Sequence, residues 1–253
     1  MPENLIVIMV VVVALETVMP LAPALWCYWK TDGSWRYFFY GMATFFIFQG
    51  ILRIPVVSAA QMLLAGWIHK YTVVEASWML ILAVSAGFFE EGGRYVVLRH
   101  VLKPPHRWEN GVMFGLGHGA MEVLLIGVGG LVGSLIVLNT PTENLPASVA
   151  AVKVQIETTP LYMPLVSGFE RGPAIIAHVA LTLLVLRALR DPAGPKRWLL
   201  TAIGAHSLLN FVTVGVMRVV NVFVAEGLLA IVGGFALWWL LRERRFSSKN
   251  LLT

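Results

Sequence analysis

Residues 74–98 read VEASWMLILAVSAGFFEEGGRYVVL, an apolar run that carries Glu90, Glu91 and Arg94 near its end. A helix needs about 20 apolar residues to cross the hydrocarbon core of a bilayer, so this stretch predicts a membrane span. The three charged residues lie inside the span rather than beside it. The stretch therefore also predicts a polar position within the membrane.

The rest of the chain has the same character. Of its 253 residues, 58% are hydrophobic and 13% are charged, whereas about 25% are charged in a typical soluble domain. Arg53 and Pro55 interrupt the second apolar run, which is too long for one straight crossing, so we expect seven or eight spans. The fold class is an all-α, polytopic transmembrane helical bundle that forms a single membrane domain, 1–253. The seven candidate spans are 5–27, 36–66, 74–98, 109–139, 171–188, 197–217 and 221–241.

Lysine and arginine cluster in every second connection between the predicted spans. Because cytoplasmic loops are enriched in these residues, the pattern predicts an N-terminus outside and a cytoplasmic C-terminus. Because the charges flank apolar spans, we interpret the net charge of +5 as a signal of orientation in a lipid bilayer and expect no nucleic-acid partner. In the long outer connection 140–170, the segment 147–157 is either a surface helix or an ordinary loop. The basic-rich connections hold Lys30 and Arg36; Arg99, Lys103 and Arg107; Arg187, Arg190, Lys196 and Arg197; and Arg242, Arg244, Arg245 and Lys249.

Four predicted spans each place one ionisable residue at a similar depth. Glu90, His118, His178 and His206 each lie nine to eleven residues from a basic residue at the cytoplasmic end of their span. At about 1.5 Å per helical residue, that distance is about 13–17 Å, close to the middle of a ~30 Å core. An ionisable side chain at that depth costs about 2.5–3.5 kcal/mol, so these residues are candidates for a functional site.

Three of these residues have a polar neighbour one helical turn away. Glu90 is followed by Arg94, His118 by Glu122, and His206 by Asn210, each at a spacing that stacks side chains on one face. We expect Arg94 to hold one carboxylate of the Glu90–Glu91 pair, and Glu122 either to orient His118 or to face water. Two further expectations concern other positions: Arg53 is a snorkelling or paired residue, and the glycines Gly92, Gly93, Gly115, Gly117 and Gly119 allow close helix packing.

Together, Glu90-Glu91-x-x-Arg94, Phe114-x-x-x-His118 and His206-x-x-x-Asn210 resemble the signature of the CAAX-protease and bacteriocin-processing superfamily. The chain looks most like its YhfC-type intramembrane metalloproteases, relatives of the PrsW proteases. The resemblance covers about residues 74–215, the helices expected to be catalytic, and it implies a membrane-associated protein or peptide as substrate. It also implies the bacterial plasma membrane as location.

The resemblance implies a role for each matched residue. Glu90, the first of the paired glutamates Glu90 and Glu91, would act as general base with His118 on a water molecule. His206 and Asn210 would stabilise the oxyanion of the tetrahedral intermediate. The chain departs from the prenyl-protein endopeptidases of the superfamily in one spacing, because two residues rather than three separate the second glutamate from Arg94.

The residues alone leave the mechanism open. A desolvated glutamate can act as a general base without a metal, so no cofactor is needed. Alternatively, His118, His178 and His206 with Glu90 could bind zinc and leave a position for water. Two other functions also remain: a proton- or metal-coupled transporter with a Glu/His relay at mid-membrane, and a scaffold in which the polar layer only joins helices.

Overall fold

The computed structural model describes residues 2–104, 106–191 and 194–249, and every element in that part of the chain is a helix. Seven helices are long and apolar enough to cross a membrane. This result confirms the polytopic all-α prediction and leaves no eighth span among the described residues. The spans are Glu3–Lys30, Trp35–Lys70, Thr72–Leu102, Trp108–Asn139, Tyr162–Arg190, Lys196–Val219 and Val222–Arg244.

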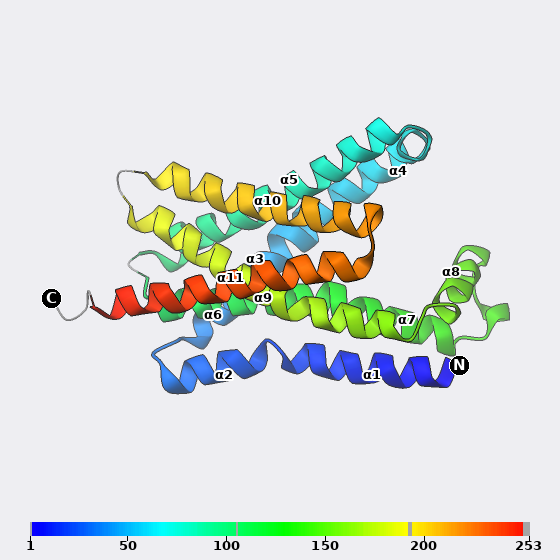
Figure 1. Cartoon of the computed structure of the whole chain (residues 1–253), viewed down its shortest axis with the longest axis horizontal. Helices are drawn as coiled ribbons and strands as arrows, with labels where there is room; N and C mark the ends of the chain where they lie inside the picture. Colours follow the sequence, from blue (N-terminus) through cyan, green and yellow to red (C-terminus); the bar gives the residue numbers. More distant parts are fainter. Residues whose placement is uncertain (1, 105, 192–193, 250–253) are drawn as a thin grey trace.

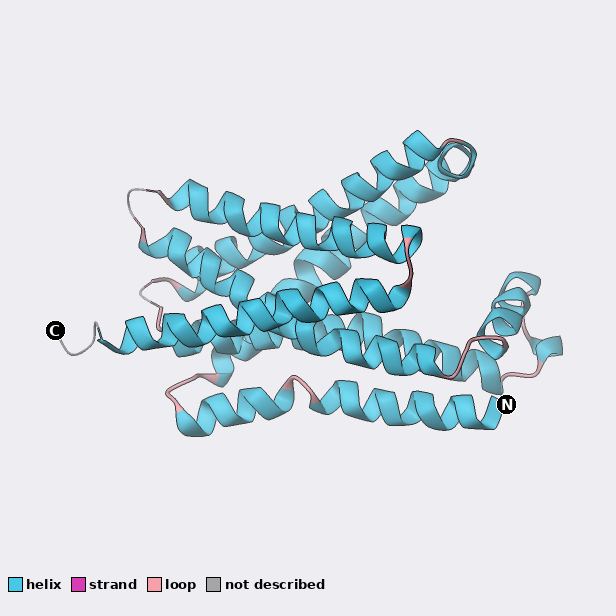
Figure 2. Cartoon of the chain, in the orientation of Figure 1, coloured by secondary structure: helices cyan, strands magenta, loops and turns pink. Residues whose placement is uncertain are grey.

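Several spans are built from more than one helical segment, and Figure 2 shows the loop that divides the first span. The first is interrupted before Pro20, which cannot donate a backbone hydrogen bond. The elements in chain order are α1 (Pro2–Val18), α2 (Leu21–Lys30), α3 (Trp35–Phe45), the π-helix η1 (Phe46–Arg53), α4 (Ile54–Lys70), α5 (Thr72–Val96), η2 (Val97–Leu102), α6 (Trp108–Glu122), η3 (Val123–Val128), α7 (Gly129–Asn139), η4 (Thr142–Asn144), α8 (Ala147–Glu157), α9 (Tyr162–Arg190), α10 (Pro195–Val219) and α11 (Val222–Lys249).

Two boundaries differ from those expected from sequence. The second span stays one continuous helical path, because a π-helical segment ends at Arg53 and Pro55 follows in the first turn of α4, where a missing N–H costs no hydrogen bond. The fifth span begins at Tyr162, nine residues before the predicted start, and it contains Pro173. Polar residues of its first turns had been assigned to the loop. The segment 147–157 is a helix, which settles that alternative.

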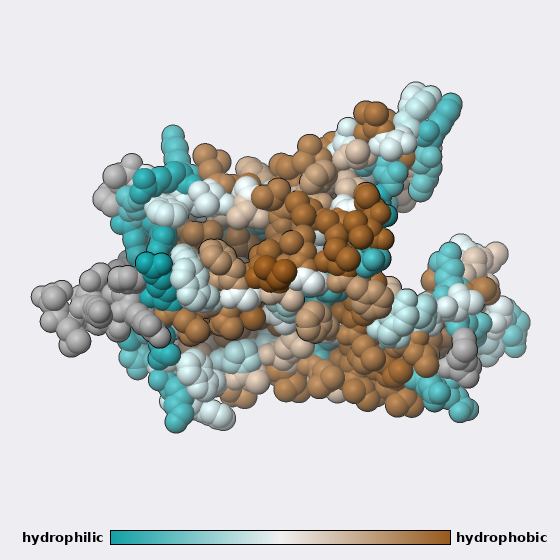
Figure 3. All heavy atoms as spheres, viewed as in Figure 1, coloured by the Kyte–Doolittle hydropathy of each residue, from teal (hydrophilic) through white to brown (hydrophobic). Residues whose placement is uncertain are grey.

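The long helices lie side by side in a bundle (Figure 1). The segment α1 begins at the end of the bundle where α8 and the α4–α5 turn lie, whereas α11 runs to the opposite end. An odd number of crossings requires this arrangement. Side chains on the visible face form an apolar belt with hydrophilic residues at both ends (Figure 3). The chain is therefore an integral, multi-pass membrane protein, while its orientation and its place in the plasma membrane stay predictions.

The helix α6 lies in the densest part of the bundle, and ten of its residues from Trp108 to Ala120 are buried. It crosses α3 through two glycines. A methyl group added at Gly117 would overlap the carbonyl oxygen of Phe38, and one added at Gly41 would overlap that of Phe114. Only glycine lets the two backbones approach this closely. The crossing fixes the position of His118, which follows Gly117 directly.

Candidate active site

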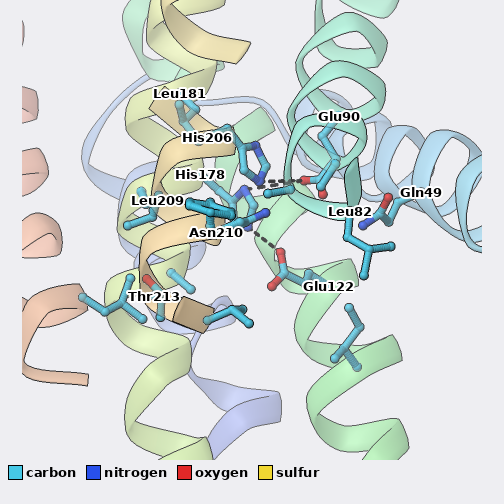
Figure 4. A pocket seen from close by; sticks show the side chains of 18 of the residues that line it. Gln49, Leu82, Glu90, Glu122, His178, Leu181, His206, Leu209, Asn210 and Thr213 are labelled. Carbon is cyan, nitrogen blue, oxygen red and sulfur yellow. Dashed lines mark hydrogen bonds and ion pairs between the residues drawn. The ribbon is translucent and has the colours of Figure 1, made fainter. Parts of the chain in front are cut away.

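The four ionisable residues predicted to share one layer do meet in the structure. Glu90 on α5, His118 on α6, His178 on α9 and His206 on α10 are all buried. Glu90 Oε2 lies 3.0 Å from His118 Nε2, 3.9 Å from His206 Nε2 and 4.0 Å from His178 Nδ1. One carboxylate oxygen therefore faces nitrogen atoms of three imidazoles, each from a different span. Figure 4 shows two of them, those of His178 and His206, beside Glu90.

Glu91 forms the second part of the cluster, and its carboxylate binds other atoms than the carboxylate of Glu90 does. It accepts hydrogen bonds from Arg94 Nη1 and, at 2.7 Å, from His206 Nδ1. The predicted role of Arg94 as a partner for one carboxylate thus applies mainly to Glu91, and its Nη2 lies 3.9 Å from Glu90. Because Nδ1 of His206 is bound to Glu91, its Nε2 is the atom that faces Glu90.

His178 is more central than its sequence context indicated. Arg94 Nη2 donates to His178 Nδ1 at 2.7 Å, since an arginine cannot accept, and this fixes the proton on Nε2. That Nε2 donates to Glu122, which also accepts from Arg171 at 3.4 Å. Glu122 therefore orients His178. Of the two alternatives expected for Glu122, it does not orient His118, and it does lie at the wall of a cavity. A partner on another helix could not be read from i, i+4 spacing.

Glycines bring the helices of the site together, but only some are those expected. At Gly87, a methyl group would lie 2.7 Å from the Ile203 carbonyl oxygen, so this glycine sets the distance between α5 and α10. At Gly115 it would lie 2.6 Å from Val179 Cα, which sets the distance between α6 and α9. The predictions for Gly115 and Gly117 are confirmed. Gly92 has open space beside it, and its predicted role in packing is wrong.

A cavity of about 330 Å³ adjoins the cluster and gives it access. Its wall includes Glu90, Glu122, His178, His206 and the half-buried Asn210, and Figure 4 labels these five side chains. The remaining wall on α5 and α10 runs toward the end of the bundle where α5 begins and α10 ends. The cavity thus extends toward the side of the membrane predicted to be external.

The cavity wall also includes two polar residues of η1 that the sequence did not single out. Gln49 and Arg53 are 6% and 8% exposed, and both line the cavity that holds Glu90. Arg53 had been assigned a snorkelling or paired role. It does not snorkel, because its guanidinium is buried. Its hydrogen-bond partners are Ser85 and the Leu82 carbonyl, and no described carboxylate lies at ion-pair distance, although the charge of Glu90 acts on it. The sequence signal that could have indicated a role for Arg53 was its charge at a predicted kink inside a membrane span.

The cluster has donor atoms that suit a divalent metal ion. Glu90, His118 and His178 offer ligand atoms that lie within 4.8 Å of one another. Two ligands of a tetrahedral zinc ion are about 3.3 Å apart, close to the distances around Glu90. Glu91 and Glu122 hold the outward nitrogens of His206 and His178, as carboxylates do for metal-bound histidines. The residues fit such an ion, although Arg94 occupies Nδ1 of His178 in this arrangement.

The fold and the site define an integral membrane protein with a buried glutamate–histidine centre that four spans build inside the bilayer. The profile of the YhfC intramembrane metalloprotease family matches residues 7–246, and the chain belongs to this family. A relative described as "Uncharacterized membrane protein YhfC", from Bacillus subtilis (strain 168), is 30% identical over 247 residues, which cover 92% of this chain and 93% of that protein. No solved structure matches the chain. Placement among the PrsW relatives stays a prediction.

Proposed function

We propose that this protein is an intramembrane endopeptidase that hydrolyses a peptide bond of a membrane-associated protein or peptide in the cavity beside Glu90. One observation carries the proposal: a carboxylate at the wall of a cavity, that of Glu90, has one oxygen that faces three imidazoles, and two of these imidazoles also line the cavity. Hydrolysis in lipid requires a base for water and donors for the oxyanion, and these groups have that chemistry. The family name supports the assignment.

In the proposed reaction without a metal, Glu90 and His118 bind the water that attacks the peptide carbonyl. Glu90 takes the proton of that water while the new C–O bond forms, and later passes it to the amine that leaves. His206 is held by Glu91 at Nδ1 and presents Nε2 toward Glu90. When that nitrogen carries a proton, it donates to the oxyanion together with the amide of Asn210.

A divalent metal offers a second version of the same chemistry. Glu90, His118 and His178 or His206 would hold it, and when bound it would acidify a water molecule and polarise the carbonyl. Glu90 would then be a ligand rather than the free base. In either version Glu91 orients His206 and Glu122 orients His178, so the two versions differ in the role of Glu90 and in dependence on a metal.

Cleavage of a membrane-anchored reporter by purified protein in liposomes tests the proposal. We expect His118→Ala, His206→Ala and Asn210→Ala to lower kcat/KM by about 10²-fold or more, because each removes a group that acts on the water or the oxyanion. Thermal unfolding of each variant controls for folding. If all three variants fold and cleave the reporter as fast as wild type, the proposal of an endopeptidase is wrong.

Metal analysis of the purified protein separates the two versions. Stoichiometric zinc that is lost in His178→Ala, with activity removed by a chelator and restored by the metal, supports the metal version. Full activity in protein treated with a chelator supports Glu90 as the free base. The rival transporter would instead move protons or metal ions across proteoliposomes without cleaving the reporter.

A further inference from the structure

Arg53 is a buried cation at the cavity wall that the proposed chemistry leaves unused. It closes η1 and lies against α5, where Nη2 donates to the Leu82 carbonyl at 2.6 Å and Nε donates to Ser85 Oγ at 3.0 Å. These two bonds fix the plane of the guanidinium. An arginine side chain has five N–H donors, so Nη1 remains for a ligand in the cavity.

Arg53 has no described carboxylate at ion-pair distance, and the carboxylate whose charge acts on it is Glu90 across the same cavity. By contrast, Arg94 and Arg171 in the same bundle are both paired with glutamates. An unpaired charge at this depth carries a large desolvation cost. The side chain of Gln49 lines the same cavity, and its buried Oε1 lacks a hydrogen-bond donor, which a peptide N–H of a substrate can supply (Figure 4).

The distance from Arg53 to the reacting centre follows from α5. Leu82 and Ser85 precede Glu90 by eight and five residues, which places the guanidinium about 7–12 Å along the helix axis from Glu90. An extended peptide advances about 3.3 Å per residue. When the scissile bond of an extended substrate lies at Glu90, the residue beside Arg53 is therefore the second, third or fourth from that bond.

We propose that Arg53 is a specificity residue that binds a carboxylate of the substrate two to four residues from the scissile bond. The carboxylate is either an aspartate or glutamate side chain or the free C-terminus of the substrate. Guanidinium and carboxylate match in charge and in paired hydrogen-bond geometry. This inference rests on the proposed function for the meaning of the scissile bond, whereas the binding of the carboxylate can be measured without cleavage.

The position of Arg53 favours a peptide carboxylate over a lipid phosphate. Arg53 contacts α5 at Leu82 and Ser85, ten and thirteen residues after that helix starts at Thr72, which is about 15–20 Å along the axis from its first residue. Phosphate groups of bilayer lipids lie outside the ~30 Å hydrocarbon core. A peptide that enters the cavity from the end of the bundle where α5 begins reaches this depth without moving a headgroup into the core.

Binding of synthetic Leu/Ala membrane peptides to the Glu90→Gln protein in nanodiscs tests the inference. One pair carries a central aspartate or asparagine, and a second pair ends at the same depth in a free carboxylate or an amide. We expect one of the two acids to bind at least about 10-fold more tightly than its matched amide, since hydrogen bonds to charged groups are strong. The pair that discriminates identifies the source of the carboxylate.

The Arg53 variants decide whether that discrimination comes from this side chain. Arg53→Gln should bind acid and amide equally, and Arg53→Lys should keep part of the preference, while affinity for the amide peptide stays unchanged in both. Equal binding of acid and amide to the Glu90→Gln protein overturns the proposal, even if Arg53→Gln fails to fold. Loss of affinity for both peptides alike also overturns it, because that pattern marks a structural arginine. Cleavage of the reporter by wild type remains a separate test of the protease.

Discussion

Two helices of the bundle, α4 and α6, lie at opposite extremes of packing. The helix α6 has ten buried residues, whereas α4 has none. On α4, Met62 and Leu63 are 75% and 84% exposed, while Met113 on α6 is fully buried. Both helices are apolar, so hydropathy alone does not separate them. The difference lies in glycines placed against other backbones, which α6 has and α4 lacks.

The comparison explains where a functional group can be held in a membrane. Lipid tails are as apolar as leucine, so burial of an apolar side chain does not by itself drive helices together. Close packing through glycine does, and it holds His118 against Glu90 with little freedom. A helix such as α4 contributes apolar surface to the lipid and can vary more freely. The predictions that follow test this difference with matched substitutions.

The largest effect is expected at the crossing of α6 and α3. Gly117→Leu should yield little folded protein, with a loss of more than about 4 kcal/mol, because the added atoms meet the Phe38 backbone and cannot move aside. Gly66→Leu on α4 has open space beside it and should fold as wild type. Size-exclusion profiles and thermal unfolding in detergent measure both. Equal yields of the two variants would break the comparison.

Two methionines provide a matched pair for the cost of a cavity. Met113→Ala should lower the free energy of unfolding by about 2–5 kcal/mol, because it empties a fully buried position. Met62→Ala replaces one lipid-facing apolar group with another and should change it by less than about 0.5 kcal/mol. Unfolding in bicelles measures the difference. A larger loss of unfolding free energy in Met62→Ala would show that α4 packs against another protein surface rather than against lipid.

Glu122 connects the packed region to the site through His178. Glu122→Gln keeps the shape of the side chain but weakens its hold on Nε2 of His178, so activity should fall about 10- to 100-fold, as for other orienting carboxylates. The exposed Glu143 on η4 supplies the control, and Glu143→Gln should cleave as wild type. Reporter cleavage by the two variants measures the effect. Unchanged activity in Glu122→Gln would contradict the role of Glu122 in orienting His178 for the reaction.

The smallest effect concerns His106, in the connection before α6. Burial lowers the pKa of this imidazole, while its hydrogen bond to the Leu98 carbonyl raises it and nearby Arg190 lowers it further. Because the folded state binds a proton less readily than the unfolded state, stability is complete above about pH 6.5 and falls as pH drops below it. The slope should stay under about 1.4 kcal/mol per pH unit. Thermal unfolding between pH 8 and 5 should show it, and His106→Gln should remove it.

The sequence predicted the seven spans because length and hydropathy decide membrane insertion. It placed the fifth start too late, since Glu170 and Arg171 resemble a helix end although Arg171 pairs with Glu170 inside the span. It did not find the π-helix at residues 46–53, because a change of helical period leaves no clear mark on composition. The helical character of 147–157 also had to come from the structure.

For the site, depth was predictable and partners were not. Counting residues from basic ends placed Glu90, His118, His178 and His206 in one layer, because every helix rises at the same rate. The rotation of each helix depends on packing, and the choice of Glu122 by His178 followed from it. For the same reason, Arg53 could be located in the membrane from sequence, but its position at the cavity wall could not.

The most direct test of the account is the rate at which Glu90→Gln cleaves a membrane-anchored reporter in liposomes. The substitution preserves the size of the side chain but removes its negative charge and its basicity, both of which act where one oxygen faces the three imidazoles. We predict a loss of about 10³-fold in kcat/KM at unchanged thermal stability, in the range for a missing general base or ligand. Cleavage within twofold of wild type by a folded Glu90→Gln protein would contradict the account.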